Sequence, residues 1–335
     1  MSQPNNGMSS TAENTLGSTF ANGVRESVAR TVVGQEIVVE RVLIALLTGG
    51  HLLLEGVPGI AKTLLVQAVG RAIALDFKRI QFTIDLLPSD IIGSEILDQD
   101  SGSFRIHKGP AFTNLLLADE INRASPKVQS ALLEAMQERK VSIGDKTYEL
   151  PAPFLVIATQ NPVEQAGTFE LPEAQLDRFM LRHRLTYPTQ EQEVDIVQRG
   201  LELKLKRQGD GAVPMTAFDA IDEQSSFHIR DLTEAMEAVL AVHVSDVFIR
   251  DCVELVSMTR SHEATELGCS PRAVIALVQA SRARAFIHGR DYAIPEDFFA
   301  LAQDVVLHRI RLTYEALADG RSGEDVLTEI LTTLA

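Results

Sequence analysis

Apolar positions in the first half of the chain follow two alternating patterns. Short runs of consecutive apolar residues indicate buried strands, whereas apolar residues that recur every three or four positions indicate amphipathic helices. Helices are predicted at 38–47 and 64–75, and strands at 52–54, 79–83, 114–118, 154–159 and 181–186. Strands separated by helices predict an α/β fold, a parallel sheet with helices on both faces.

Two short segments interrupt this alternation with a period of two around turn residues. The first, 95–106, turns at Asp100-Ser101-Gly102, and the second, 141–148, turns at Gly144-Asp145. Both patterns predict β-hairpins inserted into the α/β region. Taken alone, they fit plain surface decoration as well as a functional role.

The pattern changes after Pro188, where strand signals fade. The remaining apolar periodicity predicts an all-α region, with a loop at 208–214 and helices at 190–207, 232–240, 245–260, 271–287 and 295–311. The Ser-, Asn- and Thr-rich start of the chain predicts a disordered tail. The predicted organisation is therefore a tail at 1–23, an α/β core at 24–188 and a helical domain at 189–335.

Composition narrows the functional classes. The chain has 335 residues, with 31 Lys and Arg against 46 Asp and Glu, so its formal net charge is −15. This acidic balance disfavours a protein that coats DNA, because phosphate contacts require clustered basic residues. The apolar stretch 42–54 is interrupted and too short to span a membrane. Two cysteines are too few for a disulfide framework, and no Lys or Arg precedes Arg25, so we expect a reduced, cytoplasmic protein.

The first strand runs into a Gly-rich loop that is followed directly by a helix. This order is the context that a phosphate-binding loop requires, because backbone N–H groups and the helix N-terminus then face the phosphates. Lys62 is expected to reach the outer phosphates and Thr63 to bind Mg²⁺. Ala61 stands where the usual motif has Gly, and we expect it to adopt helical backbone angles. The residues predicted to hold the nucleotide are Gly56, Val57, Pro58, Gly59, Ile60, Ala61, Lys62, Thr63 and Leu64.

The strand at 114–118 ends in two acids, Asp119 and Glu120. A hydrophobic strand that ends this way places both carboxylates at the carboxyl edge of the sheet, where open α/β folds bind ligands. Asp119 is predicted to hold Mg²⁺ beside Thr63. Glu120 is predicted to orient and polarise the attacking water.

Three further polar residues complete the predicted site. Asn161 follows the strand at 154–159 and offers an amide to the γ-phosphate or the water, although Asn161-Pro162 alone also fits a simple turn. Arg178 lies near the end of a short predicted helix. Arg272 lies in the first turn of another, after the cap Ser270, where a cation is disfavoured unless an anion lies nearby. Surface ion pairs are the alternative for both arginines.

Together these motifs resemble those of the AAA+ ATPases, and longer stretches resemble the MoxR family. The resemblance covers about residue 24 to the C-terminus. The stretches that carry it are Gly56–Thr63, Asp85–Asp90, Leu115–Ala124, Leu132–Glu138, Gln160–Glu164, Leu176–Phe179 and Gly268–Arg272.

This resemblance implies roles for the candidate residues. Lys62 and Thr63 resemble Walker A residues, Asp119 and Glu120 Walker B residues, and Asn161 sensor 1. Gly34 and Gln35 belong to a segment that lines the adenine pocket. Arg178 resembles the arginine finger that reaches a neighbouring subunit, and Arg272 resembles sensor 2, which closes the lid on the nucleotide. No role is assigned to Arg123.

The same resemblance implies a fold and an assembly. The expected sheet order is 5-1-4-3-2, with a C-terminal all-α lid, and the ring is expected to be a hexamer. The hairpins match the family's helix-2 insert and pre-sensor-1 hairpin, both of which face the pore.

The implied function is a Mg-dependent ATPase that acts as a MoxR-type chaperone or remodeler. It would mature client proteins, for instance by metal or cofactor insertion, with a separate partner that carries a von Willebrand factor A domain. A nucleic-acid motor of the helicase-like clade and a magnesium-chelatase-like subunit remain as alternatives. The net charge and the mixed-charge hairpins make nucleic acid an unlikely partner.

Overall fold

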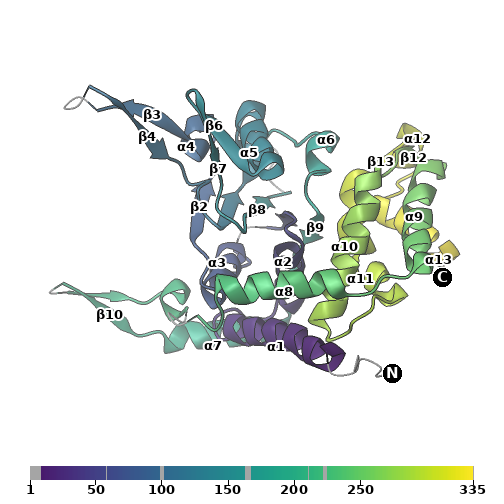
Figure 1. Cartoon of the computed structure of the whole chain (residues 1–335), viewed down its shortest axis with the longest axis horizontal. Helices are drawn as coiled ribbons and strands as arrows, with labels where there is room; N and C mark the ends of the chain where they lie inside the picture. Colours follow the sequence, from purple (N-terminus) through teal and green to yellow (C-terminus); the bar gives the residue numbers. More distant parts are fainter. Residues whose placement is uncertain are drawn as a thin grey trace, which may run out of the picture.

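The computed structural model describes residues 9–57, 59–98, 102–162, 167–209, 211–221 and 225–334. One five-stranded parallel sheet lies at its centre, in the order β2-β5-β8-β1-β9 (Figure 1). Its strands are β1 (Leu52–Glu55), β2 (Phe77–Gln81), β5 (Leu115–Asp119), β8 (Leu155–Gln160) and β9 (Leu181–Arg184). Counted along the chain, this is the expected order 5-1-4-3-2. The predicted α/β fold is confirmed.

Alternate residues of the central strands enter two hydrophobic clusters. Leu52 and Leu115 pack with the helices on one face of the sheet, whereas Leu53 and Leu116 pack with those on the other. A strand that is buried on both faces needs continuous apolar sequence, which these strands have. The first face is covered by α2 (Glu36–Thr48) and α3 (Lys62–Ala72), and the second by α4 (Pro88–Ile92) and α5 (Pro126–Glu138).

Both predicted hairpins are present. The first pairs β3 (Gly93–Leu97) with β4 (Phe104–Lys108), and the second pairs β6 (Lys140–Ile143) with β7 (Lys146–Glu149). Figure 1 shows the first hairpin extending from the body of the molecule. Asp100 and Ser101, in its predicted turn, lie outside the described residues.

A third hairpin contradicts the prediction for the segment after Pro188. The predicted helix 190–207 ends earlier, as α7 (Gln190–Glu202). The chain then forms β10 (Leu205–Gln208) and β11 (Gly211–Pro214), which pair antiparallel where a loop was expected. Gly209 has a φ of 59° and supplies the left-handed residue that such a tight turn favours.

The C-terminal part is helical, as predicted. Its helix α10 packs against α2, and α11 packs against β9, so the lid lies directly on the sheet domain. The predicted helix 295–311 is shorter, because a 3₁₀ turn and a short strand follow Val306. The elements of this part are η2 (Ala217–Ala220), α8 (Ile229–Ala241), α9 (Asp246–Ser261), β12 (Thr265–Leu267), α10 (Pro271–Ile287), α11 (Pro295–Val306), η3 (Leu307–Arg309), β13 (Arg311–Leu312), α12 (Tyr314–Ala318) and α13 (Gly323–Leu334).

The N-terminal segment corrects the prediction of a disordered tail. Residues 9–23 belong to α1 (Ser9–Ala29), which packs against α3, α8 and α10. Phe20, Val24 and Val28 are buried along one face of this helix at a spacing of four residues. This apolar stripe offsets the polar composition around it. Residues 1–8 lie outside the described residues.

One hydrophobic cluster runs from the sheet through α1 and α2 into the lid helices. The two predicted domains therefore share one hydrophobic cluster. Their division at residue 188 stays a prediction. Within the described residues, no helix is both long and apolar enough to cross a membrane.

Candidate active site

The Gly-rich loop joins β1 to α3, as the sequence predicts. Gly59 has a φ of 88°, and α3 begins at Lys62. Ala61 has a φ of 59° and a ψ of 24°, so its backbone is left-handed and the expected helical angles were wrong. Left-handed angles at this position explain why Gly usually occupies it, since Gly has no Cβ to strain them. Pro58 lies outside the described residues.

Lys62 is half-buried inside the loop that it follows. Its ammonium donates a hydrogen bond to the carbonyl oxygen of Gly56 at 2.5 Å. Burial lowers the pKa of Lys62, while the carboxylates of Asp119 and Glu120 oppose this shift. The structure therefore brings the predicted lysine and both predicted acids into one electrostatic environment. Thr63 lies beside Lys62 in the first turn of α3 and is also half-buried.

The carboxylate of Asp119 is buried and held from two sides. Thr159 donates its hydroxyl to Oδ1 at 2.5 Å. Arg79 donates Nη2 and Nε to Oδ2 at 2.7 and 3.1 Å. Both partners come from strands that neighbour β5, and the sequence analysis identified neither. Thr159 lies next to the carboxyl end of β8, whereas Arg79 lies in the middle of β2, so no shared local pattern marked them.

Glu120 follows β5 in a left-handed conformation, with a φ of 55°. Its backbone N–H donates to the hydroxyl of Thr159 at 2.9 Å. Its carboxylate accepts from Gln81 at 2.7 Å and from Arg123 at 3.1 Å. Arg123, which had no assigned role, thus contacts the predicted catalytic acid. Positive φ at a residue other than Gly is uncommon and concentrates at functional sites.

A cavity of about 490 Å³ adjoins the loop. Val33 and Gln35, from the segment expected on the adenine side, line it together with Ile60, Ala61 and Leu64. Gly34 lies between the first two with a φ of 69°, a conformation that favours Gly.

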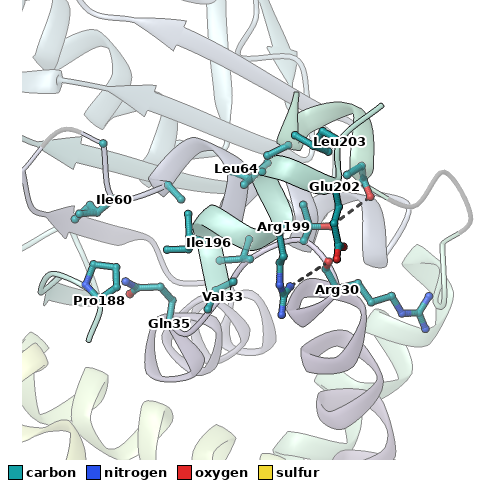
Figure 2. Close-up of a pocket in the computed structure, with 17 residues that line it drawn as sticks. Arg30, Val33, Gln35, Ile60, Leu64, Pro188, Ile196, Arg199, Glu202 and Leu203 are labelled. Carbon is teal, nitrogen blue, oxygen red and sulfur yellow. Dashed lines mark hydrogen bonds between the residues drawn. The ribbon is translucent and has the colours of Figure 1, made fainter. Parts of the chain in front are cut away.

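The far wall of this cavity was not predicted. Ile196, Arg199 and Leu203 reach it from α7 and the residue that follows. Figure 2 shows Arg199 extending toward Arg30, whose carbonyl oxygen it contacts at 3.3 Å. None of the residues of α7 is buried. Part of the apolar face of this amphipathic helix lines the cavity.

Asn161 lies at the base of the loop. Gly56 donates its N–H to the carbonyl oxygen of Gln160, the residue before Asn161, at 3.2 Å. Asn161 lines a separate cavity of about 690 Å³, together with Glu55 and Arg182. The predicted sensor thus lies at the same sheet edge as the loop and lines a cavity other than the one beside Gln35.

Neither of the two predicted arginines lines the cavity beside the loop. Arg178 lines a third cavity, of about 470 Å³, with Glu134 and Glu138 of α5. Arg272 is 57% exposed and lies 3.6 Å from Asp177, the residue before Arg178. Within one copy of the chain, neither arginine is placed with Lys62.

The oxygen donors near Lys62 suit Mg²⁺. Among the residues that the structure describes, no group of three or more His, Cys, Asp or Glu side chains could hold a metal ion. Mg²⁺ usually takes one or two protein oxygens and completes its shell with water and phosphate. The Thr63 hydroxyl and the Asp119 carboxylate are oxygens of this kind, at a helix N-terminus and a strand end.

Comparison with known proteins agrees with this arrangement. Residues 51–181 match the family model described as the ATPase family associated with various cellular activities (AAA), and residues 257–330 match the AAA lid domain. The chaperone MoxR1 of Mycobacterium tuberculosis is 44% identical, over 92% of this chain and 80% of its own length. Protein MoxR of Methylorubrum extorquens is 32% identical, over 85% of each chain.

The chain belongs to the MoxR family of AAA+ ATPases. The predicted membership is thereby confirmed. YeaC of Bacillus subtilis, at 43% identity over 92% of each chain, is a further relative. A crystal structure of a candidate ATPase from Cytophaga hutchinsonii superposes with a TM-score of 0.86 at 43% identity, over 97% of this chain and 98% of that one.

Proposed function

We propose that this family member binds ATP across the 56–64 loop and the adjoining cavity and hydrolyses it. The observation that carries the proposal is Lys62 inside the loop, sharing one environment with the carboxylates of Asp119 and Glu120. Loop N–H groups before a helix attract phosphate. The cavity beside Gln35 has apolar walls that suit a purine ring.

Each residue would then have a distinct task. Lys62 binds the outer phosphates, and Glu120 accepts a proton from the attacking water while Asn161 orients it. Thr63 and Asp119 would hold Mg²⁺, which neutralises charge on the phosphates when it is bound. Thr159 fixes both Asp119 and the backbone of Glu120, so it sets the spacing between the metal and the base.

Arg178 would act on the nucleotide of a neighbouring copy, as the resemblance implies. Arg272 was expected to close the lid on the nucleotide; because it does not line the cavity beside the chain's own loop, it would act with Arg178 on the neighbouring site instead. Neither arginine lines the cavity beside the chain's own loop, and this placement supports the role. A ring, expected to be a hexamer, brings the two faces together. An arginine that reaches the site from a neighbour contributes about 10³–10⁵-fold in related phosphoryl transfer.

The energy of hydrolysis would serve to remodel other proteins. Similarity over most of the chain to a protein named chaperone MoxR1 supports this proposal. We infer client proteins that need maturation or cofactor insertion, and a separate partner with a von Willebrand factor A domain. A cytoplasmic location accords with two cysteines that are both buried and unpaired.

The catalytic part is tested by two substitutions. Glu120→Gln should keep ATP binding and lower turnover about 10²–10⁴-fold, the usual contribution of a general base. Lys62→Ala should abolish binding. The exposed Glu149 provides the control Glu149→Gln, which should leave both unchanged. Normal turnover in Glu120→Gln would remove Glu120 from the mechanism.

The remodelling part is tested by capture from cell extract. Glu120→Gln should hold the ring with ATP bound, so partners that co-purify with ATP and not with ADP are identified. A protein with a von Willebrand factor A domain, or an incompletely matured enzyme, would support the proposal. Nucleic acid in its place would favour a nucleic-acid motor.

A further inference from the structure

Asp177, the residue directly before Arg178, lies where the lid meets the sheet domain. Three lid side chains converge on its carboxylate. The Ser270 hydroxyl lies 3.2 and 3.1 Å from the two oxygens. Arg309 donates Nε to Oδ1 at 2.8 Å, and Arg272 lies 3.6 Å from Oδ2. Asp177 itself belongs to the sheet domain, so these contacts all cross between the two parts.

Arg309 also holds the backbone on the other side of Arg178. It donates Nη2 to the carbonyl oxygen of Phe179 at 2.7 Å and Nη1 to that of Met180 at 3.3 Å. Its side chain is only 3% exposed. A guanidinium is a rigid planar fork of donors, so bonds to residues 177, 179 and 180 fix this backbone segment as one unit.

The side chain of Arg178 contrasts with its fixed backbone. It is half-buried beside α5, and no side chain within the described ranges forms a hydrogen bond or an ion pair with its guanidinium. A charge that is anchored at its base and unpaired at its tip is arranged to meet an anion from outside the chain. Its placement has to be accurate, because displacement by about 1 Å can cost 10²-fold in rate.

We propose that Arg309 is the positioning residue for Arg178, acting through Asp177 and the carbonyl groups of residues 179 and 180. The inference rests on the proposed trans role of Arg178 and deepens it. Because Arg309 belongs to the lid, the lid position of one copy sets the activity of the site on the next copy. The lid therefore affects ATP hydrolysis at the neighbouring subunit as well as packing against its own sheet domain.

The first test measures steady-state ATP hydrolysis by the whole chain. Arg309→Lys keeps the charge and removes the fork, and Asp177→Asn keeps the shape and removes the charge. Both should lower kcat about 10-fold or more with little change in KM, because a variant's own loop is intact. Arg311→Lys is the matched control, since Arg311 is exposed and pairs only with Glu173 and Glu266 among the described residues. Wild-type kcat in both Arg309→Lys and Asp177→Asn would overturn the inference.

The second test separates positioning in trans from a local structural defect. Each variant is mixed 1:1 with Lys62→Ala, whose own loop is inactive but whose Arg178 and Arg309 are intact. In a ring of head-to-tail contacts, about a quarter of the interfaces then join an intact loop to an intact arginine, so turnover should rise to roughly a quarter of the wild-type value. A lid that was merely damaged would not be rescued by its neighbour.

Arg178→Ala mixed with Lys62→Ala provides the reference. If this reference recovers and Arg309→Lys and Asp177→Asn do not, the positioning role is wrong while the proposed trans arginine stands. If the reference itself does not recover, the trans role of Arg178 fails, and the positioning role fails with it. Thermal unfolding shows whether Arg309→Lys is misfolded. If it is, recovery of turnover by Asp177→Asn on mixing with Lys62→Ala decides whether the positioning role holds.

Discussion

Ala61 has a backbone conformation that costs an L-residue about 1–2 kcal/mol. It occupies the last position before α3, with a φ of 59°. The loop nevertheless closes, since Lys62 bonds back to Gly56. The left-handed turn is therefore imposed by the surrounding strand and helix, and not by the residue type.

Ala61→Gly should increase the free energy of unfolding by up to about 1.5 kcal/mol. The relief of strain, about 1–2 kcal/mol, equals or exceeds the cost of the extra chain entropy of Gly, about 0.5–1 kcal/mol. Urea unfolding measures the change. Ala238→Gly, inside α8, is the control and should lose about 1 kcal/mol. A similar loss in both variants would contradict the argument.

His51 is a buried neutral imidazole between the sheet and α5. The N–H of Val156 donates to Nδ1 at 3.0 Å, and Nε2 lies 3.1 Å from the carbonyl oxygen of Met136, so Nε2 carries the proton. Burial lowers the pKa of His51 to about 4, although the bond to Met136 opposes this shift. The neutral ring satisfies both backbone partners.

Stability should therefore decrease in mild acid. Above pH 6.5 the ring is neutral in both states and contributes no pH dependence. Between pH 6.5 and about 4 only the unfolded chain binds the proton, so unfolding becomes easier by about 1.4 kcal/mol per pH unit, or roughly 3 kcal/mol in all. His51→Gln should make this decline shallower, whereas His107→Gln, at an exposed position, should keep the wild-type slope. Denaturant unfolding at several pH values measures both, and an unchanged slope in His51→Gln would contradict the assignment.

At the residue scale, the sequence predicted the groups whose neighbours are close along the chain. Lys62, Asp119 and Glu120 follow directly from a strand and its loop. Thr159 and Gln81 could not be assigned, because their contacts depend on which strands are adjacent in the sheet. Pairing with Asp177 likewise joins Arg272 to a residue 95 positions earlier, 272 − 177, a contact that no local pattern encodes.

At the scale of elements, α1 is the main departure from the sequence prediction. Its Ser and Asn content conceals the spacing of Phe20, Val24 and Val28. Phe20 packs edge-on against Phe227, with ring centroids 4.9 Å apart. A Cβ on Gly17 would lie 2.3 Å from the carbonyl oxygen of Phe286, so α1 approaches α10 too closely for any larger residue there.

Phe20→Ala should destabilise the protein by about 3–5 kcal/mol, the usual cost of truncating a buried Phe. A disordered tail would lose nothing. Thermal or urea unfolding distinguishes the two, with Glu26→Ala, on the exposed side of α1, as the matched control. Equal stability of both variants would restore the tail interpretation.

The strands show why other elements were predictable. β1, β5 and β8 are almost entirely buried, and continuous apolar runs encode that burial directly. β10 and β11 are fully exposed, so no hydrophobic pattern marked them, and only the Gly residues of the turn did so.

At the scale of the whole molecule, Glu40 links three helices from distant parts of the chain. Its carboxylate lies 3.0 Å from Arg25 of α1. It lies 3.4 Å from Arg284 and 3.1 Å from His288, at the end of α10. Burial alone would raise the pKa of Glu40, but the hydrogen bond to His288 and the charges of Arg41 and Arg284 lower it to about 2.

Glu40→Gln should lower the free energy of unfolding at pH 7 by about 1.5–3 kcal/mol, the range for hydrogen bonds to a charged group. The contribution of Glu40 to stability is complete above pH 4.5 and disappears as the pH falls toward 2. The reason is that the carboxylate stays charged to a lower pH in the folded chain than in the unfolded chain. The difference between the variant and wild type should therefore shrink below pH 4.5. Glu36→Gln, on the exposed start of the same helix, is the control, and a difference that stayed constant with pH would exclude the ion pairs as its origin.

Because α1 precedes the sheet domain in the chain and packs on the lid helix α10 as well as on α3, the lid is not an independent module. A chimaera that exchanged only the segment after residue 188 with that of a relative would pair foreign helices with the native α1 and Glu40. The donor's own first helix would have to be transferred as well, so the unit of exchange in this fold is discontinuous in sequence.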